Sequence, residues 1–456
     1  MLYDFFSVDK TGSELLYDQL YERIKSAIGE GLLKKGDKLP SMRALATDIS
    51  VSRTTVDTAY EQLCAEGYLI KKPRSGYYVE ADYIDVTHVN ETVAPVTERR
   101  YNPPIKYDFS SSAVDPDCTD IKFWQRCVKE ILDKPYVITS YGVPQGEGEL
   151  RDVLCEYSRR VRGVITTPDR IVIGAGTQTL LSILLGLCTE YGFDAAMEKG
   201  FFPQGEQIFS DFRYDITPLS ADKDGIILDD TVKSRMLFVN SSGSIRGSAP
   251  IPINKRVQII RWAEQRDAVI IEDDFNGELR CTSKPVPALQ GMCSERVVYI
   301  GSFSKLLLPS VRISYMVLPP VLADLYHKRM DNYNQTSSKT EQLALANYIS
   351  CGRLDRQLRK LRNIYARKAT VMYEEVKNAF PADAMVEVIE TALSVRIKLR
   401  LNADMDYLKA AAKDNGIRLG KCREKNGLKY FYLGFSGIPE GAIHDAVCAL
   451  KAVLIK

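Results

Sequence analysis

Apolar residues recur at every fourth position near the start of the chain, at Leu16, Leu20, Ile24 and Ile28. This spacing puts them on one face and predicts an amphipathic helix. Two shorter helices are predicted to follow, because Ser41 and Ser52 each precede a stretch with helical periodicity and are typical N-cap residues. Two short helices joined by a tight turn, the second opening with polar residues, favour a helix-turn-helix that reads the major groove of DNA.

The pattern changes to that of strands after Gly67. Residues 68–70 and 77–79 are β-rich runs around a basic turn, which predicts a β-hairpin, or wing. The basic residues of the N-terminal segment are Lys34, Lys35, Lys38, Arg43, Arg53, Lys71, Lys72 and Arg74. Phosphate contacts would supply most of the affinity for DNA, and Arg53 with its neighbours would read bases. The alternative is a small helical domain used for protein contacts.

From Asp108 onward, helical and strand-like patterns alternate. Residues 171–173, 236–239, 269–271 and 297–300 are short apolar runs separated by helical patterns. They predict an α/β domain with a mainly parallel sheet. Residues 81–107 have neither periodicity and contain several prolines and acids, so a linker is predicted there. The predicted domains are therefore 1–80, the winged helix, and 108–456, the α/β domain.

Composition excludes several classes of protein. The chain has 456 residues, 45% of them apolar and 26% charged, which is typical of a globular protein with more than one domain. A net charge of +2 means that a nucleic-acid partner has to be argued from local patches. The ten scattered cysteines indicate free thiols in a reducing compartment, and the three histidines, far apart in sequence, argue against a metal site. With no secretory signal and no apolar stretch of membrane length, a cytoplasmic protein without a membrane partner is expected.

The large domain contains the side chains that pyridoxal phosphate requires. Lys305, after the apolar run 297–300, supplies an amine for a Schiff base, and Asp273, after the run 269–271, supplies a carboxylate for the ring nitrogen. Hydroxyls, an arginine and a helix N-terminus suit the phosphate, and the residues in question are Gly176, Thr177, Gln178, Ser302, Ser304 and Arg312. Each is ordinary by itself: a lysine is usually a surface charge, and an aspartate often caps a helix. Their order along the chain predicts a pyridoxal phosphate site.

Residues 39–79 contain the string L-P-S-M-R-A-L-A…V-S-R-T-T-V…A-Y-E-Q-L…E-G-Y…S-G-Y-Y-V. This string closely resembles the GntR-type winged-helix domain. The resemblance implies that DNA is contacted by the start of the third helix, by the arginine after Pro-Ser and by the wing. The residues so implied are Arg43, Ser52, Arg53, Thr54, Arg74, Ser75 and Gly76.

The large domain resembles the aminotransferase-type domain of MocR-type regulators, which fuse a GntR winged helix to a fold type I aminotransferase domain. The resemblance lies in Tyr141-Gly142-x-Pro144-x-Gly146, Gly176-Thr177-Gln178, Glu272-Asp273-Asp274, residues 301–305 and Arg312. It implies pyridoxal phosphate as cofactor, Lys305 as the Schiff-base lysine and Asp273 as the partner of the ring nitrogen. It also implies a head-to-tail homodimer in which Tyr141 reaches the cofactor of the other subunit.

Several positions depart from that family's pattern. Phe275 replaces a tyrosine that bonds the phenolic oxygen of the cofactor, and Ser242 or Gly243 replaces an asparagine or histidine facing the same oxygen. Tyr432 stands where an arginine binds the substrate carboxylate, and tyrosine does not replace that bidentate group. Phe202 stands where a tyrosine often stacks on the ring. Weak or absent transaminase activity is therefore expected. Arg246, Arg423 and Lys429 are candidate substitutes for the arginine, each otherwise a surface charge.

These observations predict a transcription regulator that binds an operator through its winged helix and senses an amino compound, or pyridoxal phosphate itself, in its large domain. One alternative is an active aminotransferase with a DNA-binding appendage. Another is a cofactor-free regulator that uses the same fold as a dimer scaffold. A basic helix within residues 353–368 is either a solvated face or an additional surface for DNA.

Overall fold

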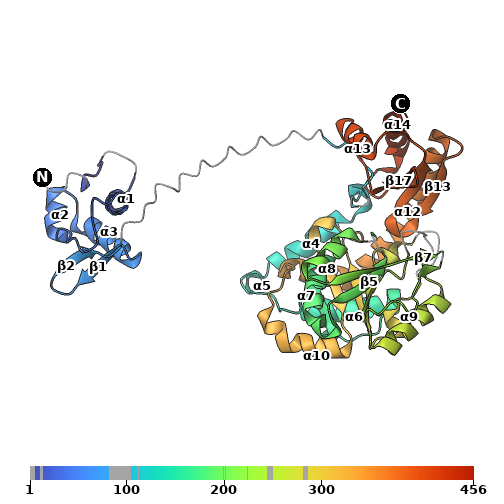
Figure 1. Cartoon of the computed structure of the whole chain (residues 1–456), viewed down its shortest axis with the longest axis horizontal. Helices are drawn as coiled ribbons and strands as arrows, with labels where there is room; N and C mark the ends of the chain where they lie inside the picture. The colour runs from blue at the N-terminus through green and yellow to red at the C-terminus, as the bar shows by residue number, and fades with distance from the viewer. Residues whose placement is uncertain are drawn as a thin grey trace. The chain divides into compact units, whose positions relative to one another are not determined.

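The computed structural model describes residues 6–10, 14–81, 104–110, 112–198, 200, 202–222, 224–243, 250–280 and 286–455. The chain divides into two compact units, Met1–Asn102 and Pro103–Lys456 (Figure 1). Most of the predicted linker at 81–107 lies outside the described residues.

The N-terminal unit contains the predicted helices and wing. Its elements are α1 (Leu16–Gly29), α2 (Met42–Asp48), α3 (Arg53–Ala65), β1 (Leu69–Lys72) and β2 (Gly76–Val79). The strands pair antiparallel, and the apolar faces of the three helices form one buried core that includes Ile24 and Tyr60. Both predicted N-caps are confirmed, because Ser41 Oγ accepts from Ala44 N at 3.2 Å and Ser52 Oγ accepts from Thr55 N at 3.1 Å.

The second unit is built on a seven-stranded sheet. In spatial order its strands are β4 (Ile171–Gly174), β12 (Ser314–Val317), β11 (Val297–Ser302), β10 (Val269–Asp273), β9 (Met236–Val239), β5 (Asp194–Glu198) and β6 (Asp215–Leu219). Strands β11, β10, β9, β5 and β6 run parallel to one another, whereas β12 runs antiparallel to both β11 and β4. The predicted α/β fold with a mainly parallel sheet is confirmed.

Helices cover both faces of this sheet, which explains why its strands read as continuous apolar runs. The helices of this part are α4 (Ile121–Leu132), α5 (Pro135–Ile138), α6 (Gly148–Arg162), α7 (Thr177–Leu187), α8 (Pro203–Asp211), α9 (Ile253–Arg266), α10 (Pro320–Arg329) and α11 (Lys339–Ser350). On β10, Ile271 packs in the cluster of α7, α8 and α10, while its neighbour Ile270 packs in the cluster of α9. Successive residues of the strand therefore point to opposite faces.

A second, four-stranded sheet occupies the C-terminal end of the large unit (Figure 1). Its order is β13 (Met385–Ile389), β14 (Ser394–Leu399), β17 (Leu428–Gly434) and β16 (Cys422–Lys425), all antiparallel. The helices α12 (Arg353–Ala379), α13 (Met405–Asp414) and α14 (Ile443–Leu454) pack with it. Short pairings join β3 (Tyr107–Asp108) to β15 (Ile417–Arg418), and β7 (Ala221–Asp222) to β8 (Gly225–Ile226). Within the described part of the chain, no helix has the length and apolar character needed to cross a membrane.

A buried ion pair joins the end of α6 to the residue that follows β10. The Nε of Arg162 lies 2.5 Å from Asp274 Oδ2 and its Nη2 lies 2.9 Å from Asp274 Oδ1, with both side chains 0% exposed. The hydroxyls of Tyr299 and Ser242 also donate to this carboxylate, at 2.7 and 2.8 Å. Good geometry and added hydrogen bonds are what offset the desolvation of such a pair.

Replacing Arg162 by methionine should leave Asp274 buried without its cation and destabilise the large unit by about 3–5 kcal/mol. The control is Arg126→Met, which breaks the exposed pair with Glu130 and should cost less than about 1 kcal/mol. Denaturant unfolding followed by tryptophan fluorescence measures this unit alone, because Trp124 and Trp262 both lie in it. Equal losses in the two variants would contradict the role given to the buried pair.

Candidate cofactor and DNA-binding sites

One edge of the large sheet brings the predicted cofactor residues together. The carboxyl ends of β4, β10 and β11 meet there with the start of β12, since Ser314 is paired with both Gly174 and Ser302. Asp273 is paired with Ile300, two residues before Ser302. Ligands of open α/β sheets bind at this edge. The predicted residues 176–178, 273, 302–305 and 312 all lie at the ends of these strands.

The predicted phosphate residues come from three of these strand ends. Gly176 precedes α7 with a φ of +94°, and a Cβ built on it would lie 2.5 Å from Arg312 Nη2, so only glycine admits the guanidinium here. Among the described residues no side chain caps the N-terminus of α7. Ser302 Oγ lies 3.2 Å from Ser304 Oγ. Free helix amides, hydroxyls and a guanidinium together fit a phosphate group.

Asp273 is the buried acid of this edge. It is 7% exposed, and no described residue forms a hydrogen bond or ion pair with its side chain. Burial, and the negative charge of neighbouring Asp274, raise the pKa of Asp273 to about 7. Asp274 is paired with Arg162, and the carboxylate of Glu272 accepts hydrogen bonds from the backbone N–H groups of Leu289 and Gln290. Both acids beside Asp273 therefore have partners, whereas Asp273 has none among the described residues. A protonated ring nitrogen would supply the missing donor.

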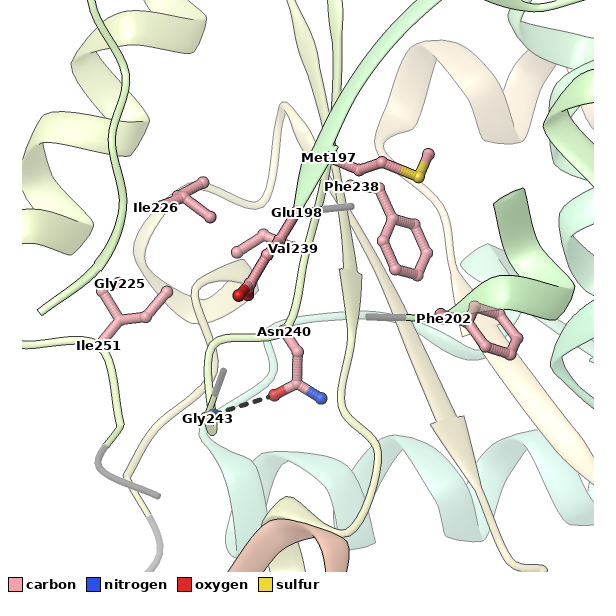
Figure 2. A pocket seen from close by; sticks show the side chains of 10 residues that line it. All are labelled: Met197, Glu198, Phe202, Gly225, Ile226, Phe238, Val239, Asn240, Gly243 and Ile251. Carbon is pink, nitrogen blue, oxygen red and sulfur yellow. Dashed lines mark hydrogen bonds between the residues drawn. The ribbon is translucent and has the colours of Figure 1, made fainter. Parts of the chain in front are cut away.

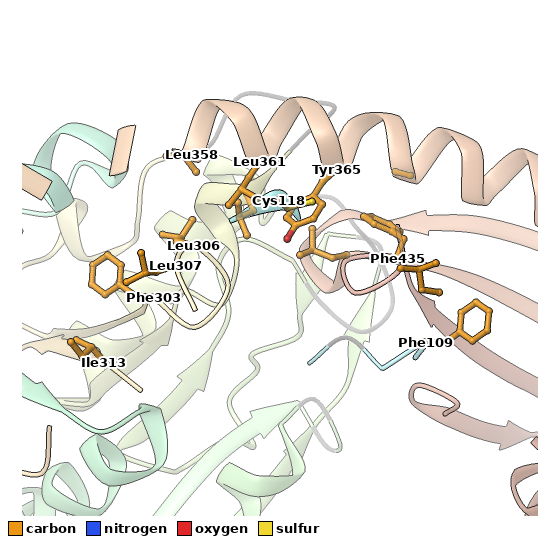
Figure 3. Packing of buried hydrophobic residues seen from close by; sticks show 14 of the residues in the cluster. Phe109, Cys118, Phe303, Leu306, Leu307, Ile313, Leu358, Leu361, Tyr365 and Phe435 are labelled. Atoms are coloured by element: carbon orange, nitrogen blue, oxygen red, sulfur yellow. The ribbon is translucent and has the colours of Figure 1, made fainter. Parts of the chain in front are cut away.

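Lys305 is held in place by the apolar residues on either side of it. Phe303, Leu306 and Leu307 are buried beneath α12, whose Leu358 and Leu361 point toward them (Figure 3). The Lys305 Nζ donates to the carbonyl of Ala113 at 2.8 Å and lies 3.4 Å from Ser436 Oγ. Burial lowers the pKa of Lys305 to about 8, against a smaller opposing effect of Asp108. A neutral amine, the form that attacks an aldehyde, is therefore accessible near neutral pH.

A pocket lies beside this edge, between the ends of β5 and β9 (Figure 2). Its space of about 360 Å³ includes a part open to solvent. Phe202 and Phe238 line one side, with ring centroids 6.0 Å apart and an interplanar angle of 22°. Asn240 lies in the middle, and its Oδ1 accepts from the backbone N–H of Gly243 at 3.1 Å. Phe202, which is predicted to stack on the cofactor ring, therefore lines a pocket.

The positions that depart from the family pattern have different surroundings. Phe275 is 38% exposed. Ser242 is buried, and its hydroxyl is bonded to Asp274 and Arg162, whereas Gly243 lines the pocket. Tyr432 is paired directly with Arg396 across β17 and β14.

The three candidate substitutes for the missing arginine also differ. Lys429 is buried and paired with Glu424 at 3.0 Å, so it is a structural charge and not a ligand-binding one. Arg423 donates to the carbonyl of Gly200, two residues before Phe202. Arg246 lies outside the described residues.

Two predicted residues are exposed in the single chain. Tyr141 is fully accessible, at 102% of its reference surface, and Gln178 is also exposed. Within the described part of the chain, no hydrogen bond or ion pair joins the side chain of either residue to another predicted site residue. Their contribution to a cofactor site stays a prediction, and for Tyr141 that prediction involves a second subunit.

Sequence reasoning missed the buried network beneath the site. Besides Arg162 and Asp274, it contains Glu278, whose Oε1 accepts from the Tyr157 hydroxyl at 3.2 Å. Burial, with Asp274 nearby, raises the pKa of Glu278 to about 8. The run of acids 272–274 after an apolar strand was a signal, because adjacent buried carboxylates need partners. Nothing in the sequence indicated that the partner would be Arg162.

The predicted DNA-binding residues lie on α2, on α3 and on the wing. Arg43, Arg53 and Thr54 are exposed, and the Ser52 hydroxyl caps α3. Arg74 and Ser75 are exposed in the turn between the strands, where Gly76 has a φ of +114° and the Ser75 hydroxyl lies 2.7 Å from the Tyr78 hydroxyl. Among the described residues, the three arginines of this set, Arg43, Arg53 and Arg74, form no ion pair. They remain available for phosphates and base edges.

The basic helix is α12, and most of its cations are used within the chain. Arg353 lies 3.8 Å from Asp120, Arg367 lies 3.2 Å from Glu440, and Lys368 forms a buried pair with Asp115 at 2.7 Å. Arg362 and Lys360 donate to backbone carbonyls. These contacts favour the interpretation of α12 as an ordinary solvated helix over its interpretation as a second DNA-binding surface.

Comparison with known proteins agrees with both halves of the chain. Residues 16–79 match the family model described as bacterial regulatory proteins, gntR family. An uncharacterized HTH-type transcriptional regulator of Bacillus subtilis (strain 168), YdeL, is 34% identical over 448 residues, which cover 96% of each chain. The probable rhizopine catabolism regulatory protein MocR of Rhizobium meliloti is 28% identical over 98% of this chain and 95% of its own.

The chain belongs to the MocR-type transcriptional regulators.

Solved structures resemble the large domain of this MocR-type regulator. An archaeal alanine:glyoxylate aminotransferase aligns with a TM-score of 0.69 at 18% identity, over 76% of this chain and 90% of the other. The α-aminoadipate aminotransferase LysN of Thermus thermophilus, complexed with N-(5'-phosphopyridoxyl)-L-leucine, aligns with a TM-score of 0.67 at 19% identity, over 76% and 91%. The fold of the large domain is therefore that of the aminotransferases, as the sequence predicted.

Because the pKa of Lys305 is lowered, the fraction of its amine that is neutral should change between about pH 7 and about pH 9, where an ordinary lysine stays charged. Its neutral fraction should rise from about one-tenth at about pH 7 to about nine-tenths at about pH 9. The rate at which pyridoxal phosphate becomes attached to the cofactor-free regulator should rise over the same interval. Stopped-flow absorbance measures the rate, and borohydride reduction with peptide mapping identifies the lysine.

The control for this measurement is Lys328→Ala, which removes a lysine from the last turn of α10 and should leave the attachment unchanged. Lys305→Ala should abolish it. An attachment rate that rises only near the pKa of free lysine, about 10.4, would contradict the lowered pKa of Lys305.

Proposed function

We propose that this MocR-type regulator binds an operator through its winged helix, holds pyridoxal phosphate at Lys305, and senses an amino compound or the cofactor itself. The observation that carries the proposal is the buried carboxylate of Asp273. It has no partner among the described residues, yet it lies at the ligand-binding edge of the sheet. A buried acid without a partner costs free energy that a cationic ring nitrogen would offset.

In this proposal each side chain has one task. Asp273 accepts a hydrogen bond from the protonated ring nitrogen, and Phe202 packs against the ring. Arg312, with Ser302, Ser304 and the amides at Gly176, Thr177 and Gln178, binds the phosphate. Lys305 provides the amine. When bound, pyridoxal phosphate supplies an aldehyde that reacts reversibly with amines, which is how the large domain would distinguish an amino effector from other metabolites.

We further propose a head-to-tail homodimer that works in the cytoplasm. The segment around Tyr141 exposes an unusual number of large apolar side chains for the surface of a lone chain. They are Ile121, Leu132, Tyr136, Ile138, Tyr141 and Val143. A second copy placed against this segment would bury them and would bring Tyr141 to the partner's cofactor.

Transaminase activity should be weak or absent. The exposed Phe275 offers no hydroxyl, the Ser242 hydroxyl is bonded within the chain, and Tyr432 replaces the carboxylate-binding arginine. A group that bonds the transition state contributes to rate, and its loss is not compensated by packing. A cofactor-free scaffold is disfavoured because Asp273 would then stay buried and unpaired for no purpose.

The test is operator binding measured by fluorescence anisotropy at fixed salt, with and without cofactor and an amine. The unsubstituted regulator should change its affinity when cofactor and effector amine are added, and Lys305→Ala should bind DNA equally well but lose that response. Arg53→Ala should weaken binding by about 1–3 kcal/mol in every condition. The matched control is Arg23→Ala on α1.

Two results would overturn the proposal. Normal ligand response in Lys305→Ala would remove the role of the amine. Equal operator affinity for Arg53→Ala, Arg23→Ala and the unsubstituted regulator would show that Arg53 does not contribute to operator binding.

A further inference from the structure

Two cations converge on one neutral carbonyl, that of Gly200. Lys421 Nζ donates to Gly200 O at 2.6 Å, and Arg423 Nη2 donates to the same oxygen. Gly200 connects Glu198 and Phe202, which both line the pocket. Neither cation forms an ion pair with any residue that the structure describes. Since an ammonium has three N–H donors and a guanidinium has five, most of their donors are left for another acceptor.

The register of the small sheet puts these cations beside Tyr432. Cys422 pairs with Phe431 and Arg423 pairs with Tyr430, and the N–H of Tyr432 donates to the carbonyl of Lys421 at 2.9 Å. Lys421 is therefore opposite Tyr432, and opposite residues of an antiparallel pair share a face. That face is the one from which the family's arginine would reach the substrate carboxylate.

Arg396, on the other side of Tyr432, has a different role. It forms an ion pair with Glu387 of the neighbouring strand. Although burial opposes it, hydrogen bonding to Tyr432 and the charge of Glu387 raise the pKa of Arg396. This guanidinium is already committed within the sheet. Lys398 and Lys425 share this face, but Lys398 lies over the Tyr430 ring and Lys425 is exposed at the end of β16. The two cations that meet at Gly200 are Lys421 and Arg423, displaced from Tyr432 by one strand, about 5 Å.

The electrostatics of the pair favour an anion. Burial, followed by repulsion from Arg423, lowers the pKa of Lys421 to about 8. The carboxylates of Glu206 and Glu198 oppose this effect less strongly. An anionic group placed between the two cations would relieve their repulsion and favour the charged ammonium.

The separation between Gly200 and Lys305 also sets the length of the ligand. Gly200 follows β5, and Lys305 follows β11, three strands away in the sheet order, or about 14 Å. This backbone separation favours an effector longer than an α-amino acid, in which a single carbon separates the amine and the carboxylate.

We propose that Lys421 and Arg423 form the anion-binding end of the effector site, and that the effector is a primary amine whose carboxylate is several carbons from its nitrogen. This inference rests on the proposed function, because it takes Lys305 as the place where the effector's amine is recognised. It differs from the family arrangement in using Arg423 of β16 and Lys421, which precedes that strand, in place of the β17 arginine.

Calorimetric titration of the cofactor-loaded, full-length regulator tests this with matched probes. 5-Aminopentanoate should bind at least about tenfold more tightly than pentylamine, its analogue without the carboxylate, and more tightly than alanine. Lys421→Gln and Arg423→Gln should each remove most of that advantage and leave pentylamine binding unchanged. The control is Lys425→Gln, which removes an exposed cation from the same strand, two residues beyond Arg423.

A second measurement does not depend on the cofactor. Glutarate should raise the thermal midpoint of the Lys305→Ala regulator, and the added Lys421→Gln change should abolish that rise. Circular dichroism of each variant checks that it is folded. If every amine fails to bind the loaded regulator, both the proposed function and this inference are wrong. If pentylamine binds as tightly as 5-aminopentanoate, the inference alone is wrong, and Lys421 and Arg423 only hold the Gly200 loop.

Discussion

The site depends on one buried carboxylate, that of Asp273, which has no partner among the residues that the structure describes. Asp273 ends a central strand, has no partner among the described residues, and has a pKa raised to about 7 by burial and by Asp274. Its two acidic neighbours are satisfied, Asp274 by Arg162 and Glu272 by backbone N–H groups. Among the described residues, Glu272 and Asp274 have partners and the acid between them has none, and a cation from outside the chain would complete this arrangement.

The rest of the large domain keeps that carboxylate and the amine of Lys305 in fixed positions. The Arg162–Asp274 pair links α6 to the strand end, and the apolar residues around Lys305 pack under α12 (Figure 3). The departures from the aminotransferase pattern fall on groups that would act in catalysis or bind a substrate carboxylate. The groups that would bind the cofactor are retained. A domain that keeps cofactor-binding groups and lacks catalytic groups suits a protein that recognises an amine and does not convert it. A regulatory role of this kind is consistent with the GntR winged helix in the N-terminal part of the chain.

Much of this could be predicted from the sequence because the signals are local. Helical spacing, serine caps and apolar runs depend on neighbouring residues, so the three N-terminal helices, the wing and the parallel strands were predicted correctly. Lys305 and Asp273 could be predicted as site residues because each comes after an apolar run of the sequence. Arg162 was not, since its partner lies 112 positions away and no local pattern records that contact. The convergence of Lys421 and Arg423 on Gly200 likewise depends on the meeting of two segments that are far apart in the sequence.

Nitrogen-15 NMR of the regulator loaded with pyridoxal phosphate labelled at the ring nitrogen tests the central claim most directly. The account predicts that this nitrogen is protonated at neutral pH in the unsubstituted protein and loses its proton in Asp273→Ala. A ring nitrogen that is unprotonated in the unsubstituted protein, or whose signal is the same in both proteins, would contradict it.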